Sequence, residues 1–278
     1  MRLGAVAYDP KVVTIWEGFR AWFGERGLEF DYLLFSNYEA QVEAHLAGWI
    51  DVAWNSPLAW VRTRRLAGDG AARAIAMRDS DRDLTSVVVV RSGGGIEALS
   101  DLRGRTVAVG AVDSPQATLL PLSHLRAEGL VPGDDLEVRH FDVLGGKHGD
   151  HIGGERDGAR ALAAGEVDAA CMLDSTHLLM VREGTLAAGT TRVLAQTAPF
   201  DHCNLTVVGA ETEGEERLRS LLLEMSYDDP EVRPLLDLEG LRAWLPARYE
   251  GYRALESAVD EAGFYDSQGA ITAAGYRY

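Results

Sequence analysis

A seven-residue pattern occurs twice in this chain. Residues 47–53 read Ala-Gly-Trp-Ile-Asp-Val-Ala, and residues 164–170 read Ala-Gly-Glu-Val-Asp-Ala-Ala. In each copy the Gly predicts the end of a helix and a tight turn, and the residues after it predict a short buried strand that Asp opens. A repeat on this scale predicts two similar α/β lobes rather than one continuous sheet.

The spacing of apolar residues predicts helices and strands in alternation on both sides of the first copy. In the first lobe we expect strands at 2–8, 29–35, 50–54 and 72–78, and helices at 12–26, 38–47 and 57–67. In the second lobe we expect strands at 86–91, 106–110, 136–142, 167–173 and 191–196, and helices at 115–128 and 158–164. Helices near 214–225 and 247–263 are expected to pack on the first lobe.

This order predicts a two-lobed α/β fold, in which each lobe is a mainly parallel sheet flanked by helices. The chain is expected to cross between the lobes near 84–91 and 203–208, and the two crossings would act as a hinge. Lobe 1 would comprise residues 1–85 plus 207–278, and lobe 2 residues 86–206. Because ligands of open α/β sheets bind beyond the carboxyl ends of the strands, the loops 54–57 and 173–176 should face a cleft.

Composition bounds the class of protein. The chain has 278 residues, of which 46% are hydrophobic, and this is enough for one large or two medium domains. The net charge of −16 argues against nucleic acid and against an anionic membrane surface as partners. No apolar run of about 18 residues occurs, so we expect no membrane insertion.

The start of the chain bears on localisation. Residues 3–7 already read as a core strand, and no basic segment followed by an apolar stretch and a cleavage site precedes them. The sequence as it stands therefore predicts a cytoplasmic protein. If residue 1 is an artificial start, a periplasmic or extracellular location is expected instead.

Four segments resemble the periplasmic-binding-protein type II ("Venus-flytrap") fold, and most closely the phosphate/phosphonate-type substrate-binding proteins of ABC transporters. They are residues 46–59, 87–90, 99–108 and 164–170, and the resemblance extends over roughly 2–210. It implies a body that closes on a small molecule, requires no cofactor and, if exported, works with an ABC permease. The chain departs from the pattern at Asp113-Ser114-Pro115-Gln116 and in the long loop 145–157.

Three dipeptides, Asp9-Pro10, Ser56-Pro57 and Ser114-Pro115, combine a polar capping residue with Pro at the first helical position. Helix N-termini of this kind carry free N–H groups and attract anions. Aimed at one cleft, they would bind phosphate, phosphonate, sulfonate or carboxylate. The alternative is that each dipeptide only starts a helix.

Two lysines stand out, because only Lys11 and Lys147 are lysines among the 27 basic residues. Each could supply a compact positive charge to an anionic ligand or form a Schiff base, and the alternative is a solvated surface position. With these two lysines, the residues that we expect to bind the ligand are Tyr8, Trp54, Asn55, Ser56, Ser114, Gln116, Thr118, His148, His151, Asp174 and His202.

The loop containing His148 and His151 and the pair His202-Cys203 hold donors that metals prefer. Together with Glu155 they could bind a divalent metal. The spacing also allows polar ligand contacts without a metal, or neither role.

Three functions remain open at this point. The first is a small-molecule binding protein, and the second is a cytoplasmic enzyme of lyase or biosynthetic type that uses His148, His151, His202 and Cys203. The catalytic candidates of such an enzyme would be His202, Cys203 and Lys147. The third is a regulatory sensor.

Overall fold

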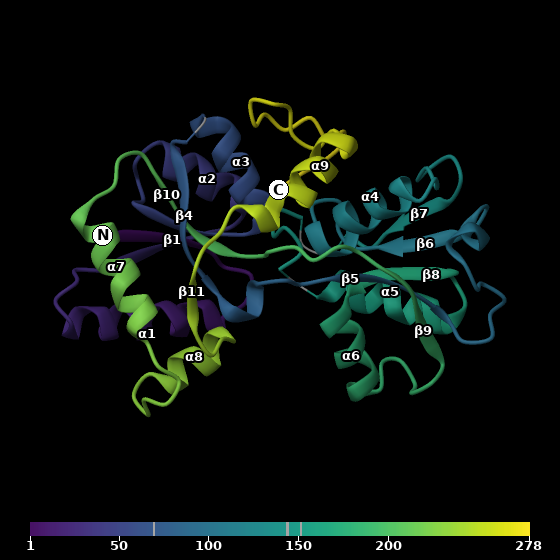
Figure 1. Cartoon of the computed structure of the whole chain (residues 1–278), viewed down its shortest axis with the longest axis horizontal. Coiled ribbons are helices and arrows are strands. Elements are labelled where there is room, and N and C mark those ends of the chain that lie inside the picture. Colours follow the sequence, from purple (N-terminus) through teal and green to yellow (C-terminus); the bar gives the residue numbers. More distant parts are fainter. Residues whose placement is uncertain (69, 143–144, 151) are drawn as a thin grey trace.

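The computed structural model describes residues 1–68, 70–142, 145–150 and 152–278. Two sheets form the centres of two lobes that lie end to end along the longest axis (Figure 1). The first sheet has the order β11-β4-β10-β3-β1-β2, with β1 (Arg2–Val6), β2 (Asp31–Phe35), β3 (Val52–Asn55), β4 (Ala72–Arg78), β10 (Asn204–Val208) and β11 (Trp244–Pro246). The second has the order β7-β6-β8-β5-β9, with β5 (Ser86–Arg91), β6 (Thr106–Val109), β7 (Glu137–His140), β8 (Ala169–Leu173) and β9 (Thr191–Gln196).

The expected two-lobed α/β architecture is confirmed, but the sheets are mixed rather than mainly parallel. β1 runs parallel to β2 and β3, and β6 runs parallel to β7 and β8. β10 is antiparallel to β3 and β4, and β5 is antiparallel to β8 and β9. β5 and β10 are the first strands after each crossing, so they enter their sheets from the opposite lobe and run against their neighbours.

Helices cover the faces of both sheets. Those of the first lobe are α1 (Lys11–Glu25), α2 (Tyr38–Leu46), α3 (Pro57–Ala67), α7 (Glu213–Glu224) and α8 (Arg233–Glu239), and those of the second are α4 (Leu120–Ala127), α5 (Gly153–Ala164) and α6 (Asp174–Glu183). Short turns complete the set: the 3-10 helices η1 (Asp79–Asp81), η2 (Leu99–Leu102) and η4 (Glu250–Tyr252), and the π-helix η3 (Pro115–Leu119). The predicted loop 173–176 is instead the end of β8, at Leu173, and the first turn of α6. None of the helices in the described residues has both the length and the apolar character needed to cross a bilayer.

The two repeat copies have the same structure. Gly48 follows α2 after one intervening residue and Gly165 directly follows α5, with φ of 75° and 77°, a conformation that glycine enters without steric cost. Asp51 and Asp168 then tie the incoming strand to its neighbour. The Oδ2 atom of Asp51 accepts the Arg2 N–H at 2.6 Å, and the Oδ2 atom of Asp168 accepts the Thr106 N–H at 3.0 Å. The Asp of the repeat therefore fixes the register of β3 on β1 and of β8 on β6.

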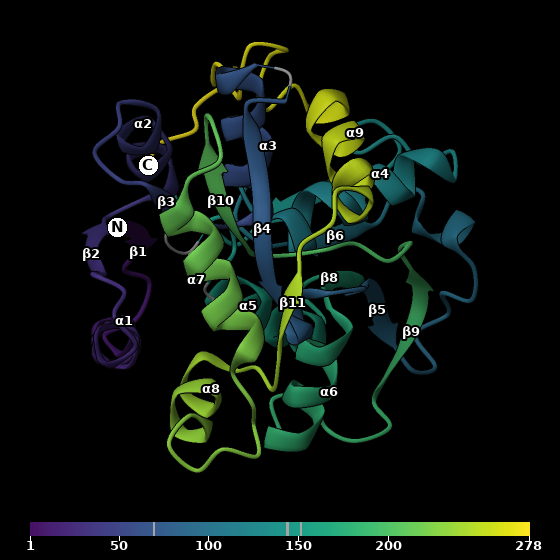
Figure 2. The same ribbon diagram turned by 60° about the vertical axis from the view of Figure 1, so that its left-hand side comes forward.

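The crossing segments pair with each other between the lobes. Leu84 and Phe200 exchange two backbone hydrogen bonds of 2.8 Å, one in each direction. Helix α9 (Arg253–Ala262), expected to pack on the first lobe, contacts both α3 and α4, and Figures 1 and 2 show it beside both lobes. Its buried Leu255 and Val259 belong to one apolar cluster that includes Trp60 of α3 and Leu120 of α4. The tail thus joins the lobes next to the crossings.

Candidate ligand-binding site

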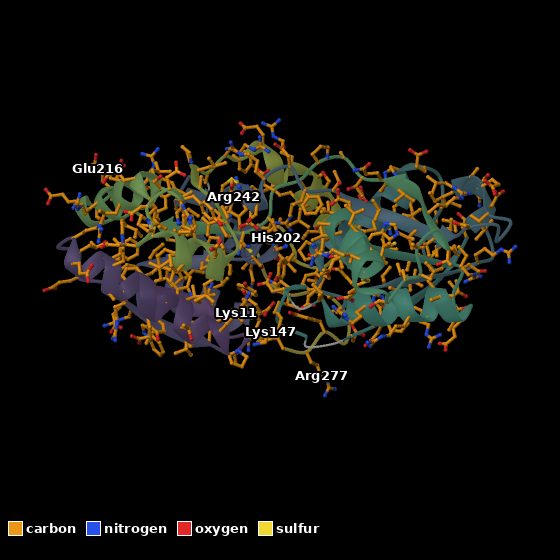
Figure 3. All side chains as sticks on the ribbon, turned by 90° about the horizontal axis from the view of Figure 1, so that it is seen from below. Lys11, Lys147, His202, Glu216, Arg242 and Arg277 are labelled. Atoms are coloured by element: carbon orange, nitrogen blue, oxygen red, sulfur yellow. The ribbon has the colours of Figure 1, made fainter. Side chains whose placement is uncertain are left out.

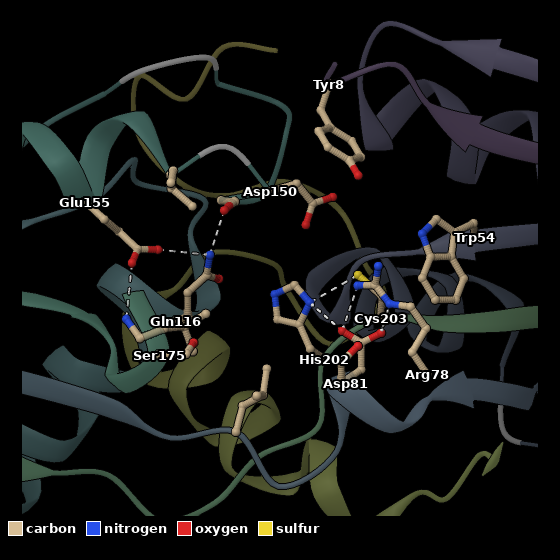
Figure 4. Close-up of a pocket in the computed structure, with 15 residues that line it drawn as sticks. Tyr8, Trp54, Arg78, Asp81, Gln116, Asp150, Glu155, Ser175, His202 and Cys203 are labelled. Carbon is tan, nitrogen blue, oxygen red and sulfur yellow. Dashed lines mark hydrogen bonds and ion pairs between the residues drawn. The ribbon is translucent and has the colours of Figure 1, made fainter. Parts of the chain in front are cut away.

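A cavity of about 230 Å³ lies between the lobes, and both contribute to its wall (Figure 4). Its lining comes from the carboxyl ends of β1, β3 and β4, from the starts of η3, α5 and α6, and from the returning crossing. The residues are Tyr8, Trp54, Arg78, Ser80, Asp81, Leu84, Gln116, Gly149, Asp150, Ile152, Glu155, Leu173, Ser175, His202 and Cys203. This is the place where the strand topology of an open α/β sheet puts a ligand.

The cavity wall carries more acidic than basic groups. Its one lining cation among the described residues, Arg78, donates to both carboxylate oxygens of Asp81, at 2.5 and 2.9 Å, and to Glu239 at 3.2 Å. Asp150 and Glu155 add two further carboxyl groups. Burial raises the pKa of Asp150, and it raises the pKa of Glu155 to about 7. A simple anion would therefore find little free positive charge here, whereas a ligand with a cationic part would be matched.

His202 lies at the centre of this wall, between Gln116 and Cys203 (Figure 4). Its Nδ1 atom is 3.1 Å from Sγ of Cys203 and 3.5 Å from Oδ1 of Asp81. Within the described chain, its buried Nε2 atom has no hydrogen-bond partner, and neither has Oε1 of Gln116. Buried polar atoms of this kind are uncommon in folded proteins, so these two atoms are available to a ligand.

Cys203 does not have the properties of a nucleophile. The side chain is buried, and burial together with the nearby carboxylates raises the pKa of its thiol well above the usual range. Burial also raises the pKa of Asp81, but the Arg78 guanidinium outweighs that effect and holds it at about 2. Asp81 therefore stays ionised while the thiol stays protonated, which disfavours attack by a thiolate.

His148 joins the lobes beside the cavity instead of lining it. The imidazole is completely buried, with Nε2 2.8 Å from Oε1 of Glu39 and Nδ1 2.7 Å from Oγ of Ser56. It also stacks on Tyr38 at 4.8 Å between ring centroids. Burial lowers the pKa of His148, but the Glu39 carboxylate raises it above its ordinary value overall. A buried histidine–glutamate pair thus connects the loop before α5 to the first lobe.

The Ser-Pro helix starts also bond within the protein. The Oγ atoms of Ser56 and Ser114 accept the N–H groups of Ala59 and Ala117, each at 3.1 Å, so both serines are N-caps. At the third start, Oδ1 of Asp9 accepts the Lys11 N–H at 2.8 Å. None of these three side chains lines the cavity.

The other expected ligand residues fall into two groups. Tyr8, Trp54, Gln116 and His202 line the cavity, as do the metal candidates Glu155 and Cys203. The rest do not line it. Asn55 accepts a hydrogen bond from Gln41, Thr118 donates to the Ala111 carbonyl, and Lys147 donates to the Ala7 carbonyl. Lys11 is exposed, and Asp174 is the first residue of α6. Both lysines project near the middle of the long axis (Figure 3). His151 lies outside the described residues.

Nine lining residues were not among the expected ones: Arg78, Ser80, Asp81, Leu84, Gly149, Asp150, Ile152, Leu173 and Ser175. The sequence did hold a signal for the first three, because a polar turn follows directly on the carboxyl end of β4. Their partners His202 and Cys203 lie more than 100 positions further along the chain. Only the returning crossing brings the two segments together.

The buried carboxyl groups predict that stability falls as pH rises from about 5 to about 8. Burial raises the pKa values of Glu155 and Glu239 from 4.5 to about 7, so the native state keeps protons that the unfolded chain has released. The raised pKa of His148 acts in the same direction, since its contribution is lost as pH rises through that value. The lowered pKa values of Asp81 and Glu39 matter only in more acidic solution, and burial of His45, which lowers its pKa to about 4, opposes the fall only below about pH 6.5. Urea unfolding at constant ionic strength would measure this.

The matched variant for that experiment is Glu155→Gln, which removes one of the titrating carboxyl groups. Between about pH 5 and about pH 8, the total fall in the free energy of unfolding should be smaller in this variant by roughly 1–3 kcal/mol. A free energy of unfolding that rises between these pH values would contradict the assignment of raised pKa values.

Known structures share this architecture. PhnD1 from Prochlorococcus marinus, in complex with methylphosphonate, is 16% identical, with a TM-score of 0.70 over 95% of this chain and 98% of that one. A Xanthomonas citri protein bound to ATP is 18% identical, with a TM-score of 0.73 over 94% and 97%. The periplasmic aliphatic sulphonate binding protein SsuA from Escherichia coli is 17% identical, with a TM-score of 0.59 over 94% and 85%. At these identities the likeness establishes the fold.

The sequence itself establishes the family. Residues 5–252 match the family described as ABC transporter, phosphonate, periplasmic substrate-binding protein. The match includes both lobes, both crossings and every residue that lines the cavity. The chain therefore belongs to the phosphonate-binding family of ABC transporter substrate-binding proteins.

Proposed function

We propose that this protein binds a small anionic or zwitterionic molecule of the phosphonate, phosphate or carboxylate kind in the cavity between its lobes. The observation that carries the proposal is a cavity whose wall is shared by both lobes and contains buried polar atoms without partners, on His202 and Gln116. Family membership supports the same function, and PhnD1, a protein of similar fold, holds methylphosphonate.

The acidic wall favours a zwitterion over a simple anion. Asp150 and Glu155 would receive a cationic group, while Nε2 of His202 would donate to the anionic end. Aromatic rings of Tyr8 and Trp54 supply apolar surface beside these groups. Burying a charged group against an opposite charge is far less costly than burying it alone. The site would therefore select a zwitterion over a simple anion.

Closure of the lobes would complete the site. The described chain passes between the sheets at 79–85 and 197–203, and hinges of this kind absorb rotation in a few residues. Closing excludes water and lowers the local dielectric constant, so each polar contact to the ligand strengthens. Binding by this route requires no cofactor. If the chain is exported, an ABC permease would receive the ligand.

The geometry gives no support to an enzyme. Cys203 is a protonated buried thiol, and the Nζ atom of Lys147 donates to the carbonyl of Ala7, 2.8 Å away, away from the cavity lining. The Nδ1 atom of His202 lies 3.1 Å from Sγ of Cys203, but burial and nearby carboxylates keep that thiol protonated, which disfavours its use as a nucleophile.

Isothermal titration calorimetry with methylphosphonate, 2-aminoethylphosphonate, inorganic phosphate and acetate tests the proposal. We expect at least one of the two phosphonates to bind, the amine-bearing one more tightly. Gln116→Leu should weaken binding at least about tenfold, because it leaves the ligand without a buried hydrogen-bond partner. The matched control is Gln196→Leu, an exposed glutamine on β9, which should bind as the wild type does. Absence of binding across the panel, or equal loss in both variants, would contradict the proposal.

A further inference from the structure

We propose that Asp81, His202 and Cys203 form a binding site for a divalent transition-metal ion of the zinc type in the wall of this cavity. The inference rests on the proposed function, and it names the group that would supply the positive charge for an anionic ligand.

The three donor atoms are spaced as ligands of one ion are. One carboxylate oxygen, one imidazole nitrogen and one sulfur lie within 4.8 Å of one another. Nδ1 of His202 is 3.1 Å from Sγ and 3.5 Å from Oδ1 of Asp81. Bonds of 2.0–2.3 Å in a tetrahedral site separate neighbouring ligand atoms by roughly 3.3–3.7 Å. Both distances from Nδ1 are close to these values, so an ion would need only small side-chain movements.

The donors are held rigidly. Asp81 belongs to η1, and Arg78 fixes its carboxylate through two hydrogen bonds. Each carboxylate oxygen has a second lone pair, so Oδ1 can accept from Arg78 and still bind an ion. His202 is held by its backbone, whose N–H donates to the Asp81 carbonyl at 2.8 Å. Outer partners that orient ligands in this way are typical of metal sites.

The unsatisfied ring nitrogen of His202 is an independent observation. The side chain is more than nine-tenths buried, and its Nε2 atom has no partner among the described residues and faces the cavity (Figure 4). With an ion on Nδ1, the ring carries its proton on Nε2 and presents an N–H donor to a molecule in the cavity. Because the two ring nitrogens point in different directions, the ion and this N–H would contact different parts of a ligand.

The surrounding charge also calls for a cation. Arg78 bonds both Asp81 and Glu239 in one buried group, so two acids share one guanidinium. A divalent ion beside Asp81 offsets this excess even after the thiol of Cys203 has lost its proton. The same ion would supply positive charge to a phosphonate, which the acidic side chains of the wall would otherwise repel.

The donor set indicates which ion. One thiolate, one imidazole and one carboxylate suit zinc and the neighbouring divalent ions, whereas magnesium and calcium require oxygen ligands. Three protein ligands leave a fourth position, and the cavity lies on that side because all three residues line it.

Cobalt provides the direct test, because a thiolate bound to Co²⁺ gives an absorption band in the near ultraviolet. Full-length protein is first stripped with a chelator and then titrated with CoCl₂ and with ZnCl₂. We expect one Co²⁺ per chain, with the thiolate band, and displacement by Zn²⁺. Cys203→Ser should abolish the band and His202→Gln should weaken Zn²⁺ binding by more than about 100-fold, beyond the loss typical of outer partners.

Two matched controls are available in the chain. Cys171→Ser replaces the other buried cysteine, on β8, and His45→Gln replaces a buried histidine of α2 whose ring nitrogens have no partner in the described residues. Both should bind Co²⁺ as the wild type does. If Cys203→Ser fails to fold by circular dichroism, His202→Gln carries the test alone. A wild type without the band, or a band that survives Cys203→Ser and His202→Gln, overturns the site.

Methylphosphonate binding to the metal-free and Zn²⁺-loaded proteins separates the two proposals. Tighter binding by at least about tenfold in the loaded protein supports the metal as the anion's partner. Equal binding with no cobalt band overturns the metal site and leaves the binding function standing. A cobalt band without binding of any phosphonate supports the site and contradicts the binding function.

Discussion

Replacing His148 with Ala should lower the free energy of unfolding by about 3–5 kcal/mol, because it breaks a buried ion pair and leaves the other charge without compensation. Glu39 and His148 are both completely buried, and their side chains meet at 2.8 Å. Burial raises the pKa of Glu39, but His148 lowers it below its ordinary value overall, so the charged carboxylate becomes costly to keep buried when its partner is gone. Urea unfolding monitored by circular dichroism at pH near 6 measures the loss.

A second substitution identifies the cause. Adding Glu39→Gln to His148→Ala removes the stranded charge and should recover much of the lost stability. His140→Ala, at an exposed histidine on β7, is the matched control and should change stability by less than about 0.5 kcal/mol. If His148→Ala is no more harmful than His140→Ala, the pair does not connect the lobes as described.

Replacing Asp201 with Ala should lower the free energy of unfolding by about 2–4 kcal/mol, because it opens the junction of the crossings. Its fully buried carboxylate accepts from Nε and NH2 of Arg248, at 2.6 and 2.7 Å, and from the N–H of Asp83 at 3.1 Å. Arg248 also pairs with Asp83, so Asp201 binds both the outgoing crossing and the tail to the returning one. Chemical unfolding and the rate of limited proteolysis in 79–85 measure the effect.

The control for this junction is another aspartate that pairs with an arginine. Asp260 of α9 bonds Arg65 at 2.8 Å, but its carboxylate is 66% exposed. Asp260→Ala should therefore change stability by no more than about 1 kcal/mol. If Asp201→Ala and Asp260→Ala lower the free energy of unfolding equally, burial of the Asp201 carboxylate does not stabilise the junction, and the interpretation is wrong.

Local sequence patterns predicted the helix and strand order well, because each depends on neighbours within a few positions. Ser56 and Ser114 cap helices as their Ser-Pro pairs indicated, and Asn37 caps α2 in the same way, each side chain accepting the N–H group three residues ahead. The elements that were missed have weaker local signals. The helix expected at 158–164 begins earlier, in the Gly-Gly pair at 153–154, and glycine masks a helix start because its intrinsic helix preference is low.

The candidate site was only partly predictable. Tyr8, Trp54 and Gln116 follow strand ends or begin a helix, and such positions reach the cavity by topology alone. His148 has the same kind of sequence context, yet it packs against Tyr38 and Glu39. Whether a histidine meets solvent, a ligand or a buried carboxylate depends on what the other lobe presents to it, and no local pattern contains that information.

The sequence alone determined the repeat, the two α/β lobes and the family, since these follow from periodicity, turn glycines and motif order along one stretch of chain. The tertiary structure decided which polar groups meet at the seam: Arg78 and Asp81 come together with His202 and Cys203, while His148 pairs with Glu39. The physical reason is that charge pairing and desolvation act over a few ångströms in space, whereas these residues are separated by about 100 or more positions in sequence.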